Sequence, residues 1–419
     1  MRLTLKEQRD RASLYWLFAL FALLPLTAVF GHRGVAPWLL LASLPAFARG
    51  DFWQSAFGQL FDRPDLRNPF FAGLVAVLAF CGWIFLSGFW SPKSQPSLIL
   101  YVLAPALVGG SVVWFALHLS RIWAYRLSAA FALSIAAGVV VLLLEGVTGG
   151  FFRSVLPPDD AGPDGARDIV ALGRGVTALA PALFPAAAIA AMLRRRRTAA
   201  AVLAVGFLAA LSNDIAANVT AITVGAIACL FALKAPRGTL LFCGSAILVL
   251  LFAAPLLAFV PVEAVFERFG GVAPPSWLHR IAVWQSVAER ASEGLPFGFG
   301  ADYARLWKES APMIEVPGAA QPLSVMPTHP HNVFLQIWLE LGLPGVFAVA
   351  IFVACGMRIL LRVRLPKVVA VAASGAAAAV TVSFMVEGSL WQVWRLAAIA
   401  LAAMGVALSY SLYNLRASS

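Results

Sequence analysis

The chain has 419 residues, of which 61% are hydrophobic and only 12% are charged, and its mean hydropathy is +0.84. A soluble globular protein carries roughly 45–50% apolar and about 25% charged residues. The composition therefore excludes a soluble enzyme, a secreted disulfide scaffold and a disordered chain, and it predicts an all-α polytopic membrane protein. The net charge of +11 is explained by basic residues gathered in cytoplasmic loops. We expect no nucleic-acid partner, because no basic stripe alternates with stacking aromatic residues.

About twelve apolar segments are candidates to cross a membrane, since a spanning helix needs about 20 mostly apolar residues. In chain order they lie at about 12–30, 34–48, 69–89, 97–118, 126–145, 176–193, 199–211, 215–233, 239–261, 344–361, 368–386 and 390–412. The segments 34–48 and 199–211 are short, so each could be tilted, re-entrant or partly interfacial. Most of the basic residues fall in alternate loops, which predicts a multi-pass protein with cytoplasmic N and C termini.

The predicted organisation has three parts. Residues 1–261 hold spans 1–9, residues 262–330 form a large loop on the outer face between spans 9 and 10, and residues 331–419 hold a histidine motif and spans 10–12. Within the loop, Trp277–Ala291 has the apolar spacing of an amphipathic helix. A second short helix is expected from Asp302 to Lys308.

The most unusual local sequence covers residues 326–345 and reads M-P-T-H-P-H-N-V-F-L-Q-I-W-L-E-L-G-L-P-G. It places His329, His331 and Asn332 where the long loop returns to the membrane, and the pattern after Asn332 is helical. Gln336 would then lie about one turn beyond Asn332. A neutral imidazole is a natural general base at neutral pH. The alternative is that the two histidines only cap the helix or form hydrogen bonds at an interface.

His331-Asn332, followed by nine residues, Gly342, two residues and Gly345, resembles the pattern H-[N/S/Q]-x9-G-x-x-G of the O-antigen ligase and polymerase superfamily. The two glycines would end the helix and begin the next span. Other segments are also similar to stretches of that family: Arg280-Ile-Ala-Val-Trp284 with Pro296-Phe-Gly-Phe-Gly300, Gly173-Arg-Gly175, and Trp391-Gln-Val-Trp394. The resemblance thus extends over most of the chain.

This resemblance implies a membrane-embedded glycosyltransferase of the C type that needs neither a metal nor another cofactor. Such an enzyme sits in the bacterial inner membrane and works on its periplasmic face, so the loop 262–330 would be periplasmic. It transfers a glycan from undecaprenyl pyrophosphate to a sugar hydroxyl of lipid A–core. By the same resemblance, His331 would take the proton of the acceptor hydroxyl.

The implied donor carries a pyrophosphate, which guanidinium groups bind well because they are planar and always charged. We expect Arg280 to make the first such contact, then Arg174, with Arg305 a weaker candidate. Any one of these arginines could instead extend to a lipid phosphate. The expected supporting or acceptor contacts are Asn332, Gln336, Trp284, His329, Asp214 and Arg395, the last with Glu387 as a possible partner.

One turn departs from the family pattern. Ser212-Asn213-Asp214 stands where many ligases have S-R-G, so the arginine of that turn is missing. Asp214 could be an acceptor-sugar contact or a helix N-cap. The alternative within the superfamily is a polymerase of O-antigen or exopolysaccharide, whose acceptor is another lipid-linked glycan. A transporter or flippase is the alternative outside it, although that class favours paired charges and broken helices at mid-depth.

Overall fold

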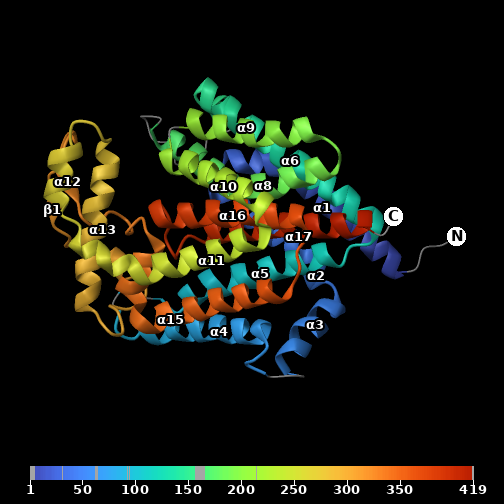
Figure 1. Ribbon diagram of the computed structural model, residues 1–419, viewed down its shortest axis with the longest axis horizontal. Helices are drawn as coiled ribbons and strands as arrows, with labels where there is room; N and C mark the ends of the chain where they lie inside the picture. The colour runs from blue at the N-terminus through green and yellow to red at the C-terminus, as the bar shows by residue number, and fades with distance from the viewer. Residues whose placement is uncertain are drawn as a thin grey trace.

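The fold is that of a computed structural model, which describes residues 5–417 apart from residues 31, 62–64, 92, 94, 156–165 and 214. Most of the long helices lie along the long axis of the molecule, and a group of shorter elements covers one end (Figure 1). Both chain termini lie at the opposite end (Figure 1). This all-α architecture agrees with the predicted fold class.

The elements follow one another in chain order. The first half has α1 (Leu5–Val29), α2 (His32–Phe47), α3 (Gly50–Phe61), α4 (Pro69–Ser87), α5 (Leu98–Leu117), α6 (Arg121–Thr148), α7 (Phe151–Val155), α8 (Ala166–Met192) and α9 (Arg196–Ser212). The second half has α10 (Ala216–Lys234), α11 (Pro236–Ala253), the 3-10 helix η1 (Ala254–Phe259), α12 (Val262–Phe269), α13 (Pro275–Glu293), α14 (Tyr303–Trp307), β1 (Met313–Ile314), β2 (Leu323–Ser324), α15 (Val333–Arg362), α16 (Lys367–Val386) and α17 (Val393–Ala417).

Ten helices in the described part of the chain are long and apolar enough to cross a membrane. The expected count of twelve is therefore not confirmed. The other two predicted spans, 34–48 and 199–211, correspond to α2 and α9, which have 16 and 17 residues. At about 1.5 Å per residue, such helices fall short of a hydrocarbon core about 30 Å thick. Both still pack into the bundle, α2 against α1 and α5, and α9 against α6 and α8.

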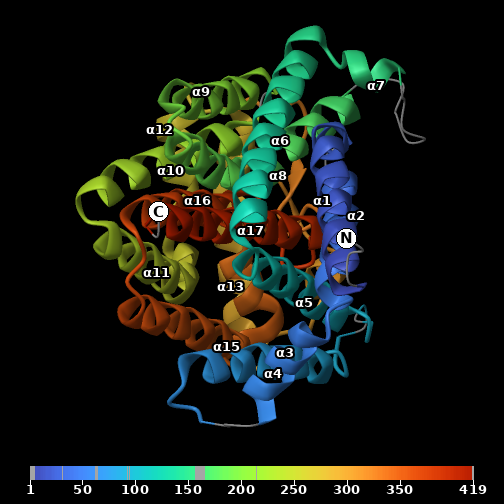
Figure 2. The ribbon, with the colours of Figure 1, turned by 90° about the vertical axis from the view of Figure 1, so that its right-hand side faces the viewer.

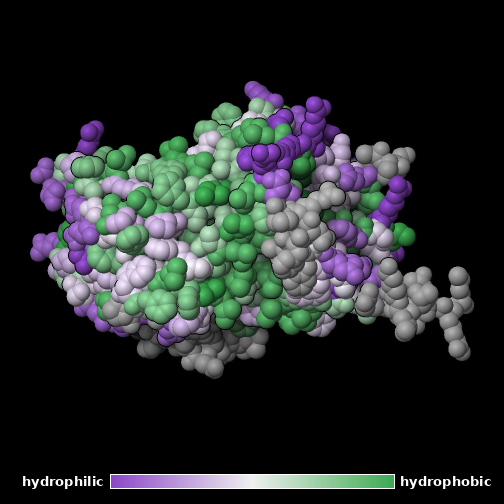
Figure 3. Space-filling view, turned by 90° about the horizontal axis from the view of Figure 1, so that it is seen from below, coloured by the Kyte–Doolittle hydropathy of each residue, from purple (hydrophilic) through white to green (hydrophobic). Residues whose placement is uncertain are grey.

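The centre of the bundle is formed by α8, α16 and α17, which Figure 2 shows from the end that carries the termini. The apolar stretch Gly173–Met192 of α8 is the most enclosed of the candidate spans, with 89% of it buried. It is rich in alanine, and such small residues let helices approach closely in a membrane. On the face seen in Figure 3, a broad apolar surface lies between hydrophilic residues at the two ends.

The segment between the ninth and tenth predicted spans caps the end opposite the termini (Figure 1). The predicted amphipathic helix is confirmed as α13, which buries Leu278, Ala282 and Val287 and packs against η1 and α15. The second predicted helix is confirmed as α14. A two-stranded antiparallel hairpin, β1 and β2, follows it and was not predicted.

The predicted break at Gly342 is a sharp kink within α15. Gly342 has φ 58° and ψ −155°, a backbone conformation that side chains rarely allow. A Cβ atom at this position would also collide with the carbonyl oxygen of Pro296. Glycine is therefore required here both by the backbone and by the close approach of the loop that contains Pro296.

The kink leaves helical carbonyl groups without their usual partners, which is costly inside a membrane protein. Groups from elsewhere in the chain replace them. The Leu339 carbonyl accepts from the Phe299 N–H (2.9 Å), the Glu340 carbonyl from the Gly300 N–H (2.8 Å) and the Leu341 carbonyl from the Trp83 indole (2.8 Å). Two motifs that are 42 residues apart in sequence, P-F-G-F-G at 296–300 and G-L-P-G at 342–345, are thus one structural unit.

Candidate active site

The two motif histidines lie side by side just before α15, at the end of the bundle opposite the termini. Their ring centroids are 4.4 Å apart, and Nδ1 of His329 accepts a hydrogen bond from the backbone N–H of His331 at 3.1 Å. Nε2 of His329 lies 3.3 Å from the Gln392 side-chain nitrogen. His331 has a positive φ of 55°, and its buried Nδ1 has no hydrogen-bond partner among the described residues. Strained backbone of this kind concentrates at functional sites, where the surrounding structure holds it in place.

Asn332 and Gln336, both predicted to be supporting or acceptor contacts, are used to hold the site together. The Asn332 side chain caps α15 by accepting from the N–H groups of Phe334 (3.0 Å) and Leu335 (3.2 Å). The Gln336 carbonyl oxygen accepts from the N–H of Leu390 at 2.8 Å, which joins α15 to the turn before α17. Both side chains are almost completely buried, and Gln336 lines a small polar cavity beside His329.

A buried carboxylate that the sequence analysis missed, Glu340, lies one turn beyond Gln336. It accepts hydrogen bonds from the Gln336 amide (3.0 Å), the Trp391 indole (2.8 Å), and the N–H groups of Asp302 (2.9 Å) and Ala304 (3.3 Å). Glu340 is the only acidic residue of α15, and an ionisable residue in a span is a signal that could have identified it.

Arg280 is brought to the histidines by α13. The neighbouring His279 hydrogen-bonds through Nε2 to the carbonyl of Ser324 in β2 (2.8 Å), which fixes the helix against the hairpin. Burial lowers the pKa of Arg280, and the negative charge of Glu387 opposes that effect. Trp284 lies one turn further along α13, and its buried indole nitrogen has no hydrogen-bond partner among the described residues.

Arg395 is almost completely buried at the start of α17. Its Nη2 lies 3.1 Å from the Glu387 carboxylate. Its Nε donates a hydrogen bond to Gln392 Oε1 at 2.6 Å, and its Nη1 donates one to Ser383 Oγ at 2.5 Å. Its guanidinium also lies 4.5 Å from the centre of the Trp394 ring. The expected Arg395–Glu387 pair is thus present, and this arginine is held rigidly by its neighbours.

Arg174 and Arg305 approach the site from two other elements, α8 and α14. The positive charges of both arginines, like that of Arg395, lower the pKa of His329. Arg305 also pairs with Asp302, whose Oδ1 lies 3.2 Å from the Arg305 Nε. The predicted cations from four helices therefore converge around the histidine pair. Asp214, the remaining predicted contact, lies outside the described residues.

The surroundings keep both imidazoles neutral. Burial lowers the pKa of His329 to about 2, and the charges of His331, Arg395, Arg174 and Arg305 contribute to the shift. Burial also lowers the pKa of His331 to about 4; Arg280, His279 and Arg395 add to this effect, and Glu387 opposes it. A neutral imidazole can accept a proton, and the surrounding guanidinium groups can bind an anion. The arrangement suits a reaction in which a hydroxyl loses a proton and a phosphate group leaves.

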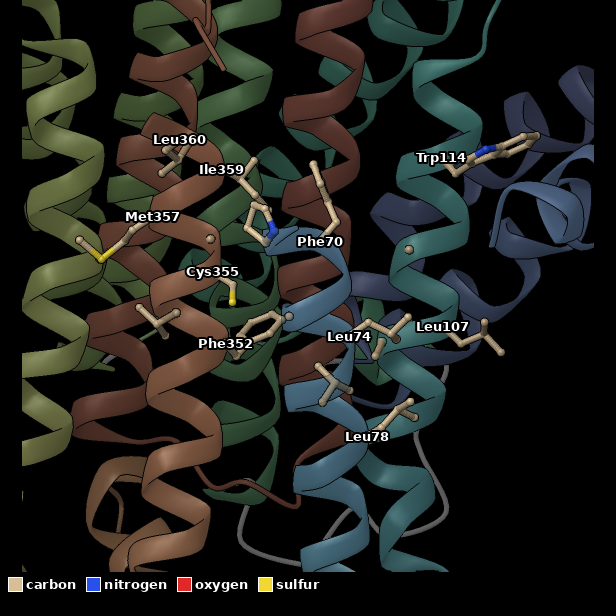
Figure 4. A pocket seen from close by; sticks show the side chains of 18 of the residues that line it. Phe70, Leu74, Leu78, Leu107, Trp114, Phe352, Cys355, Met357, Ile359 and Leu360 are labelled. Atoms are coloured by element: carbon tan, nitrogen blue, oxygen red, sulfur yellow. The ribbon is translucent and has the colours of Figure 1, made fainter. Parts of the chain in front are cut away.

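A larger cavity elsewhere in the bundle does not share this chemistry. It has a volume of about 810 Å³ and is lined by mainly apolar side chains of α3, α4, α5, α11 and α15, including Phe70, Leu107 and Phe352 (Figure 4). None of the predicted site residues lines it. The polar cluster around the histidines, rather than the larger cavity, is therefore the candidate active site.

These features define a polytopic membrane protein with a cationic, histidine-bearing site at the end opposite its termini. Residues 199–350, from α9 into α15, match the family model of the O-antigen ligase domain. This match supports the O-antigen ligase family, which the motif around His331 also indicates. The match supports a membrane glycosyltransferase of the ligase or polymerase type. No curated protein matches the chain.

Proposed function

We propose that the protein is an O-antigen ligase of the bacterial inner membrane, with its termini in the cytoplasm and its site at the periplasmic face. It would transfer a glycan from undecaprenyl pyrophosphate to a sugar hydroxyl of lipid A–core. The observation that carries the proposal is the neutral His331 among guanidinium groups from separate helices, with an Nδ1 that has no partner in the part of the chain that the structure describes.

In this reaction the imidazole of His331 takes the proton of the acceptor hydroxyl as its oxygen bonds to the anomeric carbon of the donor glycan. The bond between that carbon and the phosphate oxygen breaks, and its electron pair leaves with undecaprenyl pyrophosphate. Arg280 and Arg174 would bind the pyrophosphate, where negative charge develops as the bond breaks. Glu387, which already acts on His331, would stabilise the imidazolium that forms.

The test replaces the proposed base. We expect His331→Ala to abolish glycan transfer in membrane vesicles while protein level and membrane topology stay unchanged. The matched control is His118→Ala, since His118 is an exposed histidine at the C-terminal end of α5 that hydrogen-bonds to the Trp114 carbonyl. Transfer at the wild-type rate by the His331 variant, with purified lipid-linked donor, would exclude the catalytic role.

Analysis of lipopolysaccharide from a deletion strain tests the acceptor. Free lipid-linked polymer together with bare lipid A–core is the result expected for a ligase. A single repeat on the core, or loss of an exopolysaccharide, would instead identify the protein as a polymerase that uses the same proton transfer.

A further inference from the structure

A small polar cavity of about 90 Å³ lies beside the histidine pair, on the side of His329. Its polar lining includes Asp302 just before α14 and Arg305 within α14. It also includes Thr328 and His329 from the segment before α15, and Ser389 and Gln392 from the turn before α17. Helix α15 itself also contributes to the lining. Arg305 has a side chain that is 54% exposed, so it forms the rim through which the cavity reaches the outer face.

Asp302 supplies the only carboxylate in this lining, and the structure places it there by unusual means. Its φ is 63°, and its backbone N–H is held by Glu340 at 2.9 Å. The residue is only 5% exposed, and its Oδ1 makes no hydrogen bond within the described part of the chain, although Arg305 lies 3.2 Å away. Burial raises the pKa of Asp302 to about 6, and the positive charges of Arg305 and Lys93 oppose the rise.

Carboxylate, hydroxyl, imidazole and guanidinium groups around a space for a few water molecules match the hydrogen-bonding groups of a sugar ring edge. We propose that this cavity binds hydroxyl groups of the acceptor sugar, with Asp302 accepting their hydrogen bonds and Arg305 closing the rim. The inference rests on the proposed function, because it concerns the acceptor of that reaction.

The charges of the cavity favour the acceptor over the donor. The sugar of the donor is bonded directly to a pyrophosphate, so its binding here would bring negative charge towards the Asp302 carboxylate. Arg305, which the sequence suggested as a pyrophosphate contact, already pairs with that carboxylate. An acceptor hydroxyl carries no charge, and His329, which lines the cavity, is in contact with His331. A sugar held here would therefore present a neighbouring hydroxyl to the proposed base.

The experiment measures the binding of lipid A–core to the full-length protein in nanodiscs, in the absence of any donor. Asp302→Asn keeps the backbone conformation, since Asn tolerates positive φ, but it removes the charge. We expect it to weaken binding by about tenfold, as for a lost hydrogen bond to a charged group. Asp302→Gly, which also suits positive φ, should weaken binding at least as much. Binding of undecaprenyl pyrophosphate should change less than about twofold in both variants.

Two further variants complete the design. Glu309→Gln is the matched control, because Glu309 is an exposed carboxylate of the same outer segment that does not line the cavity. Arg305→Gln alters an exposed side chain and should also weaken lipid A–core binding while undecaprenyl pyrophosphate binding persists. Unchanged lipid A–core binding in the Asp302 variants, or weaker undecaprenyl pyrophosphate binding instead, would overturn the inference. The binding assay needs no glycan transfer, so it tests the acceptor site independently of the proposed reaction. The His331→Ala assay tests that reaction.

Discussion

The two sides of the histidine pair differ in how much of their chemistry is already used. On the His329 side, both ring nitrogens lie within hydrogen-bonding distance of the protein, at the His331 N–H and at Gln392. On the His331 side, Nδ1 has no partner among the described residues, and Arg280 and Glu387 act on the ring. The contrast suggests that His329 holds its neighbour in position and that His331 carries out the proton transfer.

The strongest test of this contrast exchanges each histidine for glutamine, which can still accept a hydrogen bond but cannot act as a base near neutral pH. His331→Gln should reduce kcat by about 10²- to 10⁴-fold, the usual contribution of a general base. His329→Gln should reduce it by about tenfold or less, because the glutamine oxygen can still accept the N–H of His331. Rates of transfer in vesicles provide the measurement. Equal losses in the two variants would contradict the division of roles.

A second test concerns the guanidinium next to His331. Arg280→Lys keeps the positive charge but loses the planar, two-pronged donor geometry, so we expect transfer to fall by about tenfold. The loss should come with a higher KM for the lipid-linked donor and an unchanged KM for lipid A–core. Arg268→Lys is a suitable control, because Arg268 is in α12 and its guanidinium is stacked on Phe269. Unchanged donor binding by the Arg280 variant would exclude a pyrophosphate contact.

Much of this site was predictable from local sequence. The apolar spacing of 277–291 predicts α13, and Gly342 marks the kink of α15, because both features depend on residues close together in the chain. The predicted spans 34–48 and 199–211 are the two whose helices are too short to be counted as membrane-crossing. They are predicted as spans because hydropathy alone does not separate a short buried helix from a membrane-crossing one.

The contacts of Glu340 could not be predicted in the same way. Its partners Asp302 and Trp391 are 38 and 51 residues distant in sequence, so only the folded chain brings them together. The spacing of Gln336 and Glu340 does predict that they share a helix face. It does not indicate that Glu340 joins α15 to the residues that line the small polar cavity.

Glu340→Gln tests whether the buried carboxylate of Glu340 supports the structure on both sides of the histidine pair. The amide of the variant would direct a donor group at one of the buried N–H groups, leaving it unsatisfied. We expect the free energy of unfolding to fall by about 1–3 kcal/mol. Trp391→Phe, which removes a single hydrogen bond to the carboxylate, should cost about 0.5–1.5 kcal/mol. Thermal unfolding in detergent measures both, and a Gln variant as stable as the wild type would show that Glu340 does not hold the site.

The smallest effect we expect is on the acid limb of the pH–rate profile, which reports the pKa of the proposed base, His331. The pKa of His331 is lowered to about 4, below its usual value of 6.5, so the base form is present above that lowered pKa. The kcat at saturating lipid A–core, which does not depend on how tightly Asp302 (pKa about 6) binds the acceptor, should therefore stay level as the pH falls past 6.5 and should decrease only as it approaches 4. The charged and titratable groups that act on His331 are Arg280, His279, Arg395 and Glu387.

Glu387→Gln removes the one negative charge among the groups that act on His331, which should lower the pKa of His331 further and move the acid limb to still lower pH. Ionisation of the donor phosphates is the same for both proteins, so the difference between the two profiles isolates the enzyme. An acid limb near 6.5 in both would show that neither the arginines nor Glu387 acts on the base.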